Sequence, residues 1–206
     1  MILGKIAELN VCGIDEAGRG PMAGPVCAAS VILPCDFDVS ILNDSKKMSE
    51  KKRNEAMTAI YTHASAWGIG WASAEEIDQL NILKASLLAM KRSYFNMMER
   101  AGDLFDCNSI EVIVDGLYCP DISLKNMKAL PRADGLFPAV MAASILAKTA
   151  RDRMMIRYSW LYPEYEYEKH KGYPTQAHIA ILHKNGPSPI QRKKFHLKGE
   201  GQLTLF

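Results

Sequence analysis

The segment G-I-D-E-A-G-R-G-P at residues 13–21 limits what this chain can fold into more than any other stretch. An apolar run from Leu9 to Cys12 precedes it, and residues 9–15 are predicted to form a strand. Asp15 and Glu16 therefore stand where the strand ends, and neighbouring strand residues point to opposite faces. Both acids can serve one site only if the backbone bends directly after them. The glycines that follow allow this bend, because glycine tolerates positive φ and leaves room for a close ligand.

Arg19 stands between Gly18 and Gly20 and adds a fixed cation with a fork of hydrogen-bond donors beside the acids. An acid pair, exposed backbone amides and an arginine together suit a divalent metal ion and a phosphodiester. The alternative is an N-terminal strand with a charged glycine turn and no chemistry. An isolated Asp-Glu pair would favour that alternative, whereas the attached Gly-Arg-Gly-Pro favours the functional interpretation.

Predicted strands and helices alternate along the rest of the chain. Apolar runs between Pro, Gly or polar residues predict further strands at 25–33, 66–72, 110–114 and 124–130. Helical periodicity predicts helices at 50–62, 82–100, 136–158 and 176–184, with Ser49 and Asn81 capping the first two. This alternation favours an α/β fold, and a hairpin between the first two strands would make the sheet mixed.

The composition fits one globular domain, and its charge distribution favours a protein that binds a polyanion. The chain has 206 residues, of which 48% are hydrophobic, enough for a sizeable core. The net charge is only +2, but residues 169–199 hold seven Lys or Arg and no acid. A basic segment on an acidic body favours a polyanionic partner, and a solvated surface is the alternative.

The cysteines and the apolar runs indicate a protein of the cytoplasm. Five cysteines occur without any C-x-x-C spacing, and an odd number excludes a complete set of internal disulfides. Free thiols in a reducing compartment are the interpretation that fits. No apolar run follows a basic start, so we expect no signal peptide, and none approaches the roughly 20 residues of a membrane-spanning helix.

Two further acids are predicted to join the first pair. Asp115 ends the strand at 110–114, and Asp134 precedes the helix at 136–158. The carboxyl ends of strands in an open α/β sheet converge on one crevice. Clustered carboxylates repel one another unless a cation joins them, and oxygen ligands suit Mg²⁺ or Mn²⁺ rather than Zn²⁺. Two such ions about 4 Å apart are the usual means of in-line phosphodiester hydrolysis.

The helix at 136–158 carries a polar stripe. Its members recur at helical spacing: Ser144, Lys148, Arg151 and Asp152. This stripe either faces solvent or turns toward the acids and a phosphate.

Several motifs, in order along nearly the whole chain, resemble bacterial ribonuclease HII. They are G-I-D-E-A-G-R-G-P-M-A-G-P-V at 13–26, N-D-S-K-K at 43–47, V-I-V-D-G at 112–116, A-A-S-I-L-A-K-T-A-R-D-R at 142–153, H-K-G-Y-P-T at 170–175 and G-P-S-P-I-Q-R-K-K-F at 186–195. The related ribonuclease HIII group has a long N-terminal substrate-binding domain. Only about ten residues precede the first predicted strand of this chain, which argues against that group.

The resemblance implies the ribonuclease H-like fold, with a central mixed five-stranded sheet flanked by helices. It implies a catalytic domain at 1–160, a small C-terminal helical extension at 161–200 that contributes to substrate binding, and a flexible tail at 201–206. The implied activity is endonucleolytic cleavage of the RNA strand of RNA–DNA hybrids, and cleavage 5′ to single ribonucleotides in duplex DNA. Two Mg²⁺ or Mn²⁺ ions would assist, and the products would carry 3′-hydroxyl and 5′-phosphate ends.

The resemblance also assigns residues to roles. The catalytic and metal-binding acids would be Asp15, Glu16, Asp115 and Asp134, and the substrate-binding residues Gly18, Arg19, Gly20, Lys46, Ser144, Lys148 and Tyr173. The glycine turn would sense the 2′-hydroxyl, the only group that distinguishes RNA from DNA at one position. Tyr173 would pack on the neighbouring sugar. For Lys46, Ser144 and Lys148, proposed at the phosphates, a solvated surface is the alternative.

The residues alone leave two other functional classes open. A non-catalytic hybrid-binding protein of this fold would be favoured by a missing acid, and all four are present. A DNA-cutting nuclease or integrase of this fold is disfavoured by the Gly-Arg-Gly turn and Tyr173.

The final segment Q-L-T-L-F resembles the short peptide by which bacterial repair enzymes hold the sliding clamp. Its candidate contacts are Gln202, Leu203, Leu205 and Phe206. The alternative is that the segment folds back and buries its apolar side chains on the body.

Overall fold

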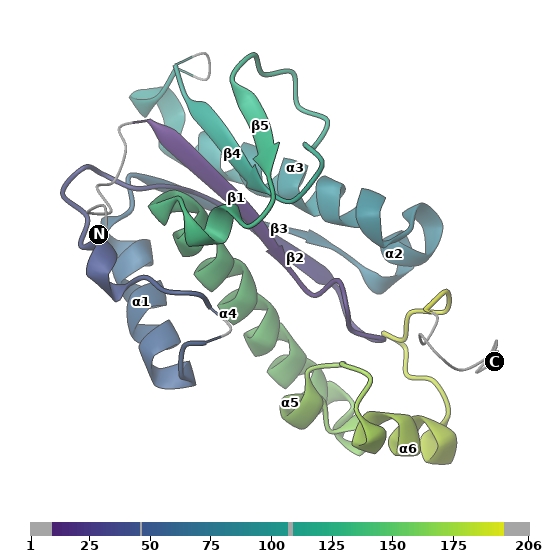
Figure 1. Cartoon of the computed structure of the whole chain (residues 1–206). Coiled ribbons are helices and arrows are strands. Elements are labelled where there is room, and N and C mark those ends of the chain that lie inside the picture. The colour runs from purple at the N-terminus through teal and green to yellow at the C-terminus, as the bar shows by residue number, and fades with distance from the viewer. Residues whose placement is uncertain (1–9, 46, 107–108, 196–206) are drawn as a thin grey trace.

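The computed structural model describes residues 10–45, 47–106 and 109–195, which build a five-stranded sheet between two layers of helices (Figure 1). The strands lie in the order β3-β2-β1-β4-β5. Their bounds are β1 Val11–Ala17, β2 Val26–Ile32, β3 Ala66–Ala72, β4 Glu111–Asp115 and β5 Met127–Leu130. β1 is antiparallel to β2 and parallel to β4, so the predicted mixed sheet and opening hairpin are confirmed.

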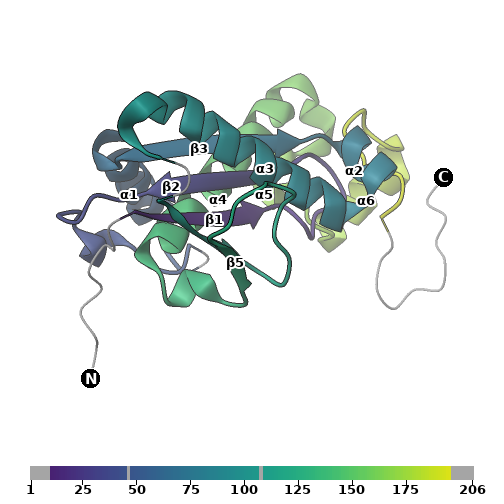
Figure 2. The same ribbon diagram turned by 90° about the horizontal axis from the view of Figure 1, so that it is seen from above.

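Six α-helices are described, and the two longest cover opposite faces of the sheet (Figure 2). Their bounds are α1 Glu50–His63, α2 Ala74–Leu80, α3 Ile82–Ala101, α4 Pro138–Leu161, α5 Tyr167–His170 and α6 Gln176–Asn185. α3 packs with Cys12 and Ile14 of β1, whereas α4 and α1 pack with Ala29 and Val31 of β2. No helix in the parts of the chain that are described has the length and apolarity to cross a membrane.

The predicted caps are confirmed. The Ser49 side chain accepts the amide of Lys52 at 3.3 Å, and the Asn81 side chain accepts that of Lys84 at 3.1 Å. The long helix begins at Pro138 rather than at the predicted residue 136, because proline is favoured in the first helical turn. α2 was not predicted, although its capping box of Ser73 with Glu76 is present in the sequence.

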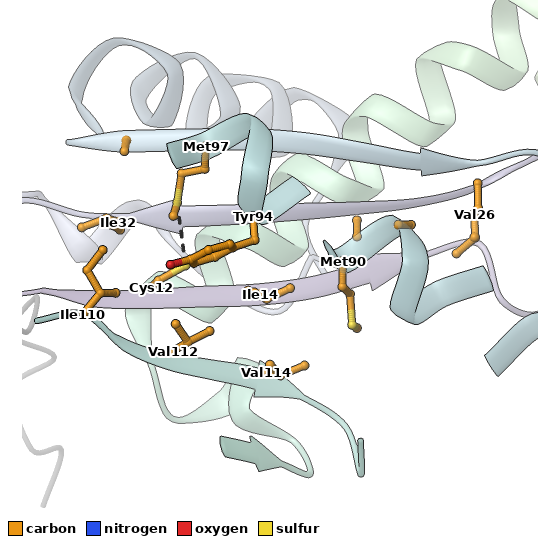
Figure 3. Packing of buried hydrophobic residues seen from close by; sticks show 14 of the residues in the cluster. Cys12, Ile14, Val26, Ile32, Met90, Tyr94, Met97, Ile110, Val112 and Val114 are labelled. Atoms are coloured by element: carbon orange, nitrogen blue, oxygen red, sulfur yellow. Dashed lines mark hydrogen bonds between the residues drawn. The ribbon is translucent and has the colours of Figure 1, made fainter. Parts of the chain in front are cut away.

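The apolar stripe of α3 forms one side of the core (Figure 3). Met90, Tyr94 and Met97 are buried against β1, and the Cys12 thiol lies 3.7 Å from the sulfur of Met97. These methionines and this tyrosine therefore pack the core rather than line a cofactor site. The face of β1 that carries Cys12 and Ile14 is closed by α3.

The glycines of β3 allow α3 to lie close to the sheet. A Cβ added at Gly68 would come within 2.3 Å of the Met97 amide nitrogen and the Ser93 carbonyl oxygen. One added at Gly70 would come within 2.1 Å of the Ala89 carbonyl oxygen. The glycine interruptions that weaken the strand pattern of this segment are thus what the packing of α3 requires.

Beyond α4, residues 162–195 fold against its C-terminal half and against the loop between β1 and β2. The apolar cluster that joins them includes Met22, Met155, Tyr167 and Leu182. The extension therefore contacts the segment that follows the acids.

We expect Gly68→Ala to destabilise the fold. The added methyl group would collide with the backbone of α3, and overpacking of this kind costs about 1–3 kcal/mol. Gly135→Ala is the matched control, because a Cβ there meets nothing within 4 Å. Urea denaturation measures both, and a G68A midpoint equal to that of the wild type would show that α3 can move away freely.

Candidate active site

The parallel pairing of β1 with β4 brings two acids together. Ile14 pairs with Val114 in register, so Asp15 and Asp115, the next residues, follow at the carboxyl ends of adjacent strands. With Glu16 they line one cavity of about 490 Å³. The predicted convergence is thus observed for three of the acids.

Strand alternation decides which way Asp15 points. Since Ile14 faces α3, Asp15 faces α4. Its carboxylate is buried, accepts the Glu16 amide at 2.6 Å and is hydrogen-bonded by Ser144 of α4. The Ser144 hydroxyl in turn lies 2.9 Å from that of Ser45. Ser45, also on the cavity wall, was not among the predicted site residues, although it lies within the quoted N-D-S-K-K motif.

The three carboxylates repel one another electrostatically. Burial raises the pKa of Asp15 well above its ordinary value, and the charges of Glu16 and Asp115 raise it further. A divalent cation would offset both effects, and the three side chains offer only oxygen atoms. The donor set therefore fits Mg²⁺ or Mn²⁺ in its chemistry. Within residues 10–45, 47–106 and 109–195, however, no three His, Cys, Asp or Glu side chains are already grouped closely enough to hold a metal ion.

Asp134 lies beside this cavity rather than on its wall. It sits in the short 3-10 turn Ala133–Gly135 and is partly buried. The amide of the preceding residue, Ala133, donates to Asp115 Oδ1 at 2.7 Å. The turn thus orients Asp115, while the Asp134 side chain is not one of the cavity-lining groups.

The glycine turn forms a second wall. β1 continues to Ala17, two residues beyond the predicted end, and the bend follows at Gly18 with φ of 102°. Arg19 Nη1 lies 3.2 Å from Glu16 Oε1. A Cβ added at Gly20 would stand 3.6 Å from the Tyr173 ring. Turn and ring therefore lie next to each other, and both line the same cavity.

The polar stripe of α4 divides between two locations. Ser144 and Lys148 line the cavity, and Lys148 Nζ lies 2.8 Å from Asp152 and 5.8 Å from the centre of the Tyr173 ring. Arg151 is fully buried beneath the glycine turn instead. The solvent-face alternative is thus wrong for Ser144 and Arg151. Lys46, and the tail residues Gln202, Leu203, Leu205 and Phe206, lie outside the described residues.

Two stacked histidines support the loop that carries Tyr173. The rings of His170 and His178 lie 4.1 Å apart at 13°. The Gly172 amide donates to His170 Nδ1, so His170 Nε2 donates to the Tyr165 carbonyl. His178 Nδ1 donates to the Tyr173 carbonyl at 3.0 Å. The His170 ring is neutral in this arrangement, because its Nδ1 accepts a hydrogen bond and therefore carries no proton.

The sequence matches the profile of the family described as Ribonuclease HII over residues 12–198. It is 56% identical over 195 residues to a Ribonuclease HII of Treponema denticola, covering 91% of this chain and 98% of that protein. It is 46% identical over 200 residues to a Ribonuclease HII of Coxiella burnetii, covering 97% and 94%.

Solved structures agree on the fold. The ribonuclease HII in the PCNA:RNase HII complex from Archaeoglobus fulgidus superposes with a TM-score of 0.70 at 25% identity, covering 96% of this chain and 100% of that chain. Bst-RNase HIII in complex with Mn²⁺ superposes with a TM-score of 0.69 at 17% identity, covering 88% and 64%. The second likeness concerns the fold alone.

We expect His178 to make the folded state sensitive to acid. Burial and, to a lesser degree, His170 lower the pKa of His178 from 6.5 to about 4. Between these values the unfolded chain binds more protons, so the free energy of unfolding falls as pH drops from about 6.5 toward 4. The full loss is on the order of 3 kcal/mol.

His178→Gln should remove most of this fall. His183→Gln is the matched control, since His183 is exposed on the same helix. Urea denaturation at pH 7 and pH 5 measures the difference. The same pH dependence in wild type and H178Q would show that another group is responsible.

Proposed function

Because this chain belongs to the ribonuclease HII family of RNase H-type endonucleases, we propose that it cuts the RNA strand of RNA–DNA hybrids and also cuts 5′ to single ribonucleotides embedded in duplex DNA. The observation that carries the proposal is the shared cavity. Carboxylates from two parallel strands, the Gly-Arg-Gly turn and Tyr173 all line it.

The acids are proposed to hold the metal ions. Asp15, Glu16 and Asp115 would bind them, and Asp134 would join from the neighbouring turn. Two Mg²⁺ or Mn²⁺ ions, when bound, would supply an activated water and stabilise the leaving 3′ oxygen. The protein keeps Asp15 and Asp115 in place through the Glu16 and Ala133 amides, so the carboxylates are oriented before substrate arrives. The products would carry 3′-hydroxyl and 5′-phosphate ends.

Ribose recognition is proposed for the other wall. No side chain of Gly18 or Gly20 keeps a sugar away from the backbone amides of the turn. Tyr173, 38% exposed beside this turn, would pack on the adjoining sugar and sense a missing 2′-hydroxyl.

Phosphate contacts are proposed for Arg19, Lys148 and Ser144, together with Lys46. Lys148 is held near the cavity by Asp152, which leaves further ammonium protons free to donate to a phosphate. Arg19, half exposed at the edge of the cavity, offers a planar donor fork.

We expect Asp115→Asn to lower kcat/KM by at least about 100-fold, since a metal-binding carboxylate contributes several kcal/mol to the transition state. Asp121→Asn, a change at a fully exposed acid on the loop after β4, should leave the rate unchanged. The assay follows a DNA duplex with one ribonucleotide, in Mg²⁺ or Mn²⁺, with product ends analysed.

Three other results would each contradict the proposal. An unchanged rate in D115N would remove Asp115 from the mechanism. Binding without cleavage by the wild type would indicate a non-catalytic hybrid-binding protein. Equal cleavage of an all-DNA duplex would indicate a DNA nuclease.

A sliding clamp is the second proposed partner. The support is the Q-L-T-L-F resemblance, together with the similar archaeal ribonuclease HII whose structure was solved in complex with PCNA. Gln202 would provide a polar anchor, and Leu203, Leu205 and Phe206 would enter an apolar pocket. Such docking would raise the local concentration of enzyme on newly copied DNA.

Deletion of residues 202–206 should abolish clamp binding and leave both the melting temperature and the cutting of short duplexes unchanged. Titration of the truncated and full chains with the clamp measures the first effect. A melting temperature several degrees lower after truncation, or undiminished clamp binding, would mean that the segment is structural.

A further inference from the structure

Two buried arginines lie beneath the glycine turn, and neither touches the cavity. Arg151, on α4, is 1% exposed, and Arg192, in the C-terminal extension, is 3% exposed. The hydrogen bonds of both guanidinium groups go to backbone carbonyls rather than to carboxylates. Two cations are therefore held close together in the interior by peptide dipoles.

Arg192 binds the turn itself. Its Nη2 donates to the Gly18 carbonyl at 2.6 Å, and its Nη1 donates to the Arg19 carbonyl at 3.1 Å. In a planar trans peptide the N–H points opposite to the C=O. The amides of Arg19 and Gly20, which share these two peptide units, are therefore directed away from Arg192. This orientation exposes donors on the side where the turn lines the cavity.

Arg151 joins the turn to the loop of Tyr173. It donates to the Ala23 and Pro25 carbonyls on one side and, through Nη1, to the Lys171 carbonyl at 3.1 Å on the other. Its side chain packs directly on Gly18, where an added Cβ would lie 2.1 Å from Nε. Arg151 thus fixes the distance between the glycine turn and the loop that carries Tyr173.

Burying two arginine charges next to each other costs free energy, and a purely structural role would not explain it. Burial and, to a lesser degree, the like charge of Arg151 lower the pKa of Arg192 to about 9. Burial likewise lowers the pKa of Arg151. Buried charged groups can often be replaced by apolar ones without loss of stability. Their presence here is explained if the multiple donors of each guanidinium hold backbone carbonyls that an apolar side chain could not hold.

We propose that Arg151 and Arg192 are positioning residues for ribose recognition: they fix the Gly18–Gly20 amides and Tyr173 at the separation that selects a 2′-hydroxyl. This inference rests on the proposed function. The two arginines touch neither substrate nor metal, and they act through the turn and the loop that they hold.

The test compares duplexes that differ by one oxygen. Binding is measured in EDTA, so that no strand is cut, with a DNA duplex carrying one ribonucleotide and with the same duplex carrying deoxyribose at that position. The wild type should prefer the ribonucleotide by about tenfold, the equivalent of one or two hydrogen bonds. Arg192→Lys and Arg151→Lys keep the charge but lose the planar fork, and the preference should fall below about threefold.

The ratio of the two affinities does not depend on how much of each variant is folded, so general destabilisation leaves it unchanged. Arg92→Lys is the matched control, because Arg92 also binds a carbonyl and a carboxylate with several donors, far from the cavity. It should keep the tenfold preference. If R192K does not fold, R151K decides.

A wild-type preference that survives in the folded arginine variants overturns this inference and leaves the proposed function intact. A wild type with neither preference nor cleavage overturns both. Amide hydrogen exchange gives a second readout: residues 18–24 should exchange faster in R192K while β1 stays protected. Unchanged exchange there would also overturn the inference.

Discussion

The parallel pairing of β1 with β4 is the constraint on which the site depends. It brings Asp15 and Asp115 to the same edge of the sheet, at the cost of burying one carboxylate beside two others. A fold selected for stability alone would avoid this arrangement. The surrounding structure offsets part of the cost locally, since the Glu16 and Ala133 amides donate to the two carboxylates.

A second requirement is a backbone turn that presents donors to the cavity. The turn after β1 has no regular hydrogen-bond ladder of its own. It depends on partners far along the chain, including Gly172, Ile190 and the Arg192 side chain. The C-terminal extension is thus structurally part of the site. This explains why a basic segment that looks like a solvated surface in the sequence contains a fully buried guanidinium.

The sequence predicted the sheet well where the pattern is local. All five strands and the four main helices occur, because apolar runs, capping residues and the Pro and Gly boundaries act over only a few residues. Tertiary contacts explain what the local pattern leaves unexplained. β3 occupies its predicted range, and the glycines Gly68 and Gly70 that interrupt its apolar pattern make room for α3, a requirement imposed by another element. Asp134 was placed with the other acids by its position before a helix, and its role there stays a prediction; the structure adds that the Ala133 amide of the same turn donates to Asp115.

The sequence by itself determined the chemistry that is available: adjacent acids, a glycine turn, a tyrosine, and the motif order of one family. Only the tertiary structure decided how these groups are oriented. Whether Ser144 faces solvent or Asp15 depends on which face of β1 is covered by α4. Whether Arg151 and Arg192 are surface cations or supports of the turn depends on hydrogen bonds to carbonyls more than 100 residues away in the sequence. A residue pattern records side-chain type and spacing, whereas the direction of a peptide dipole is set by the partners that fold against it.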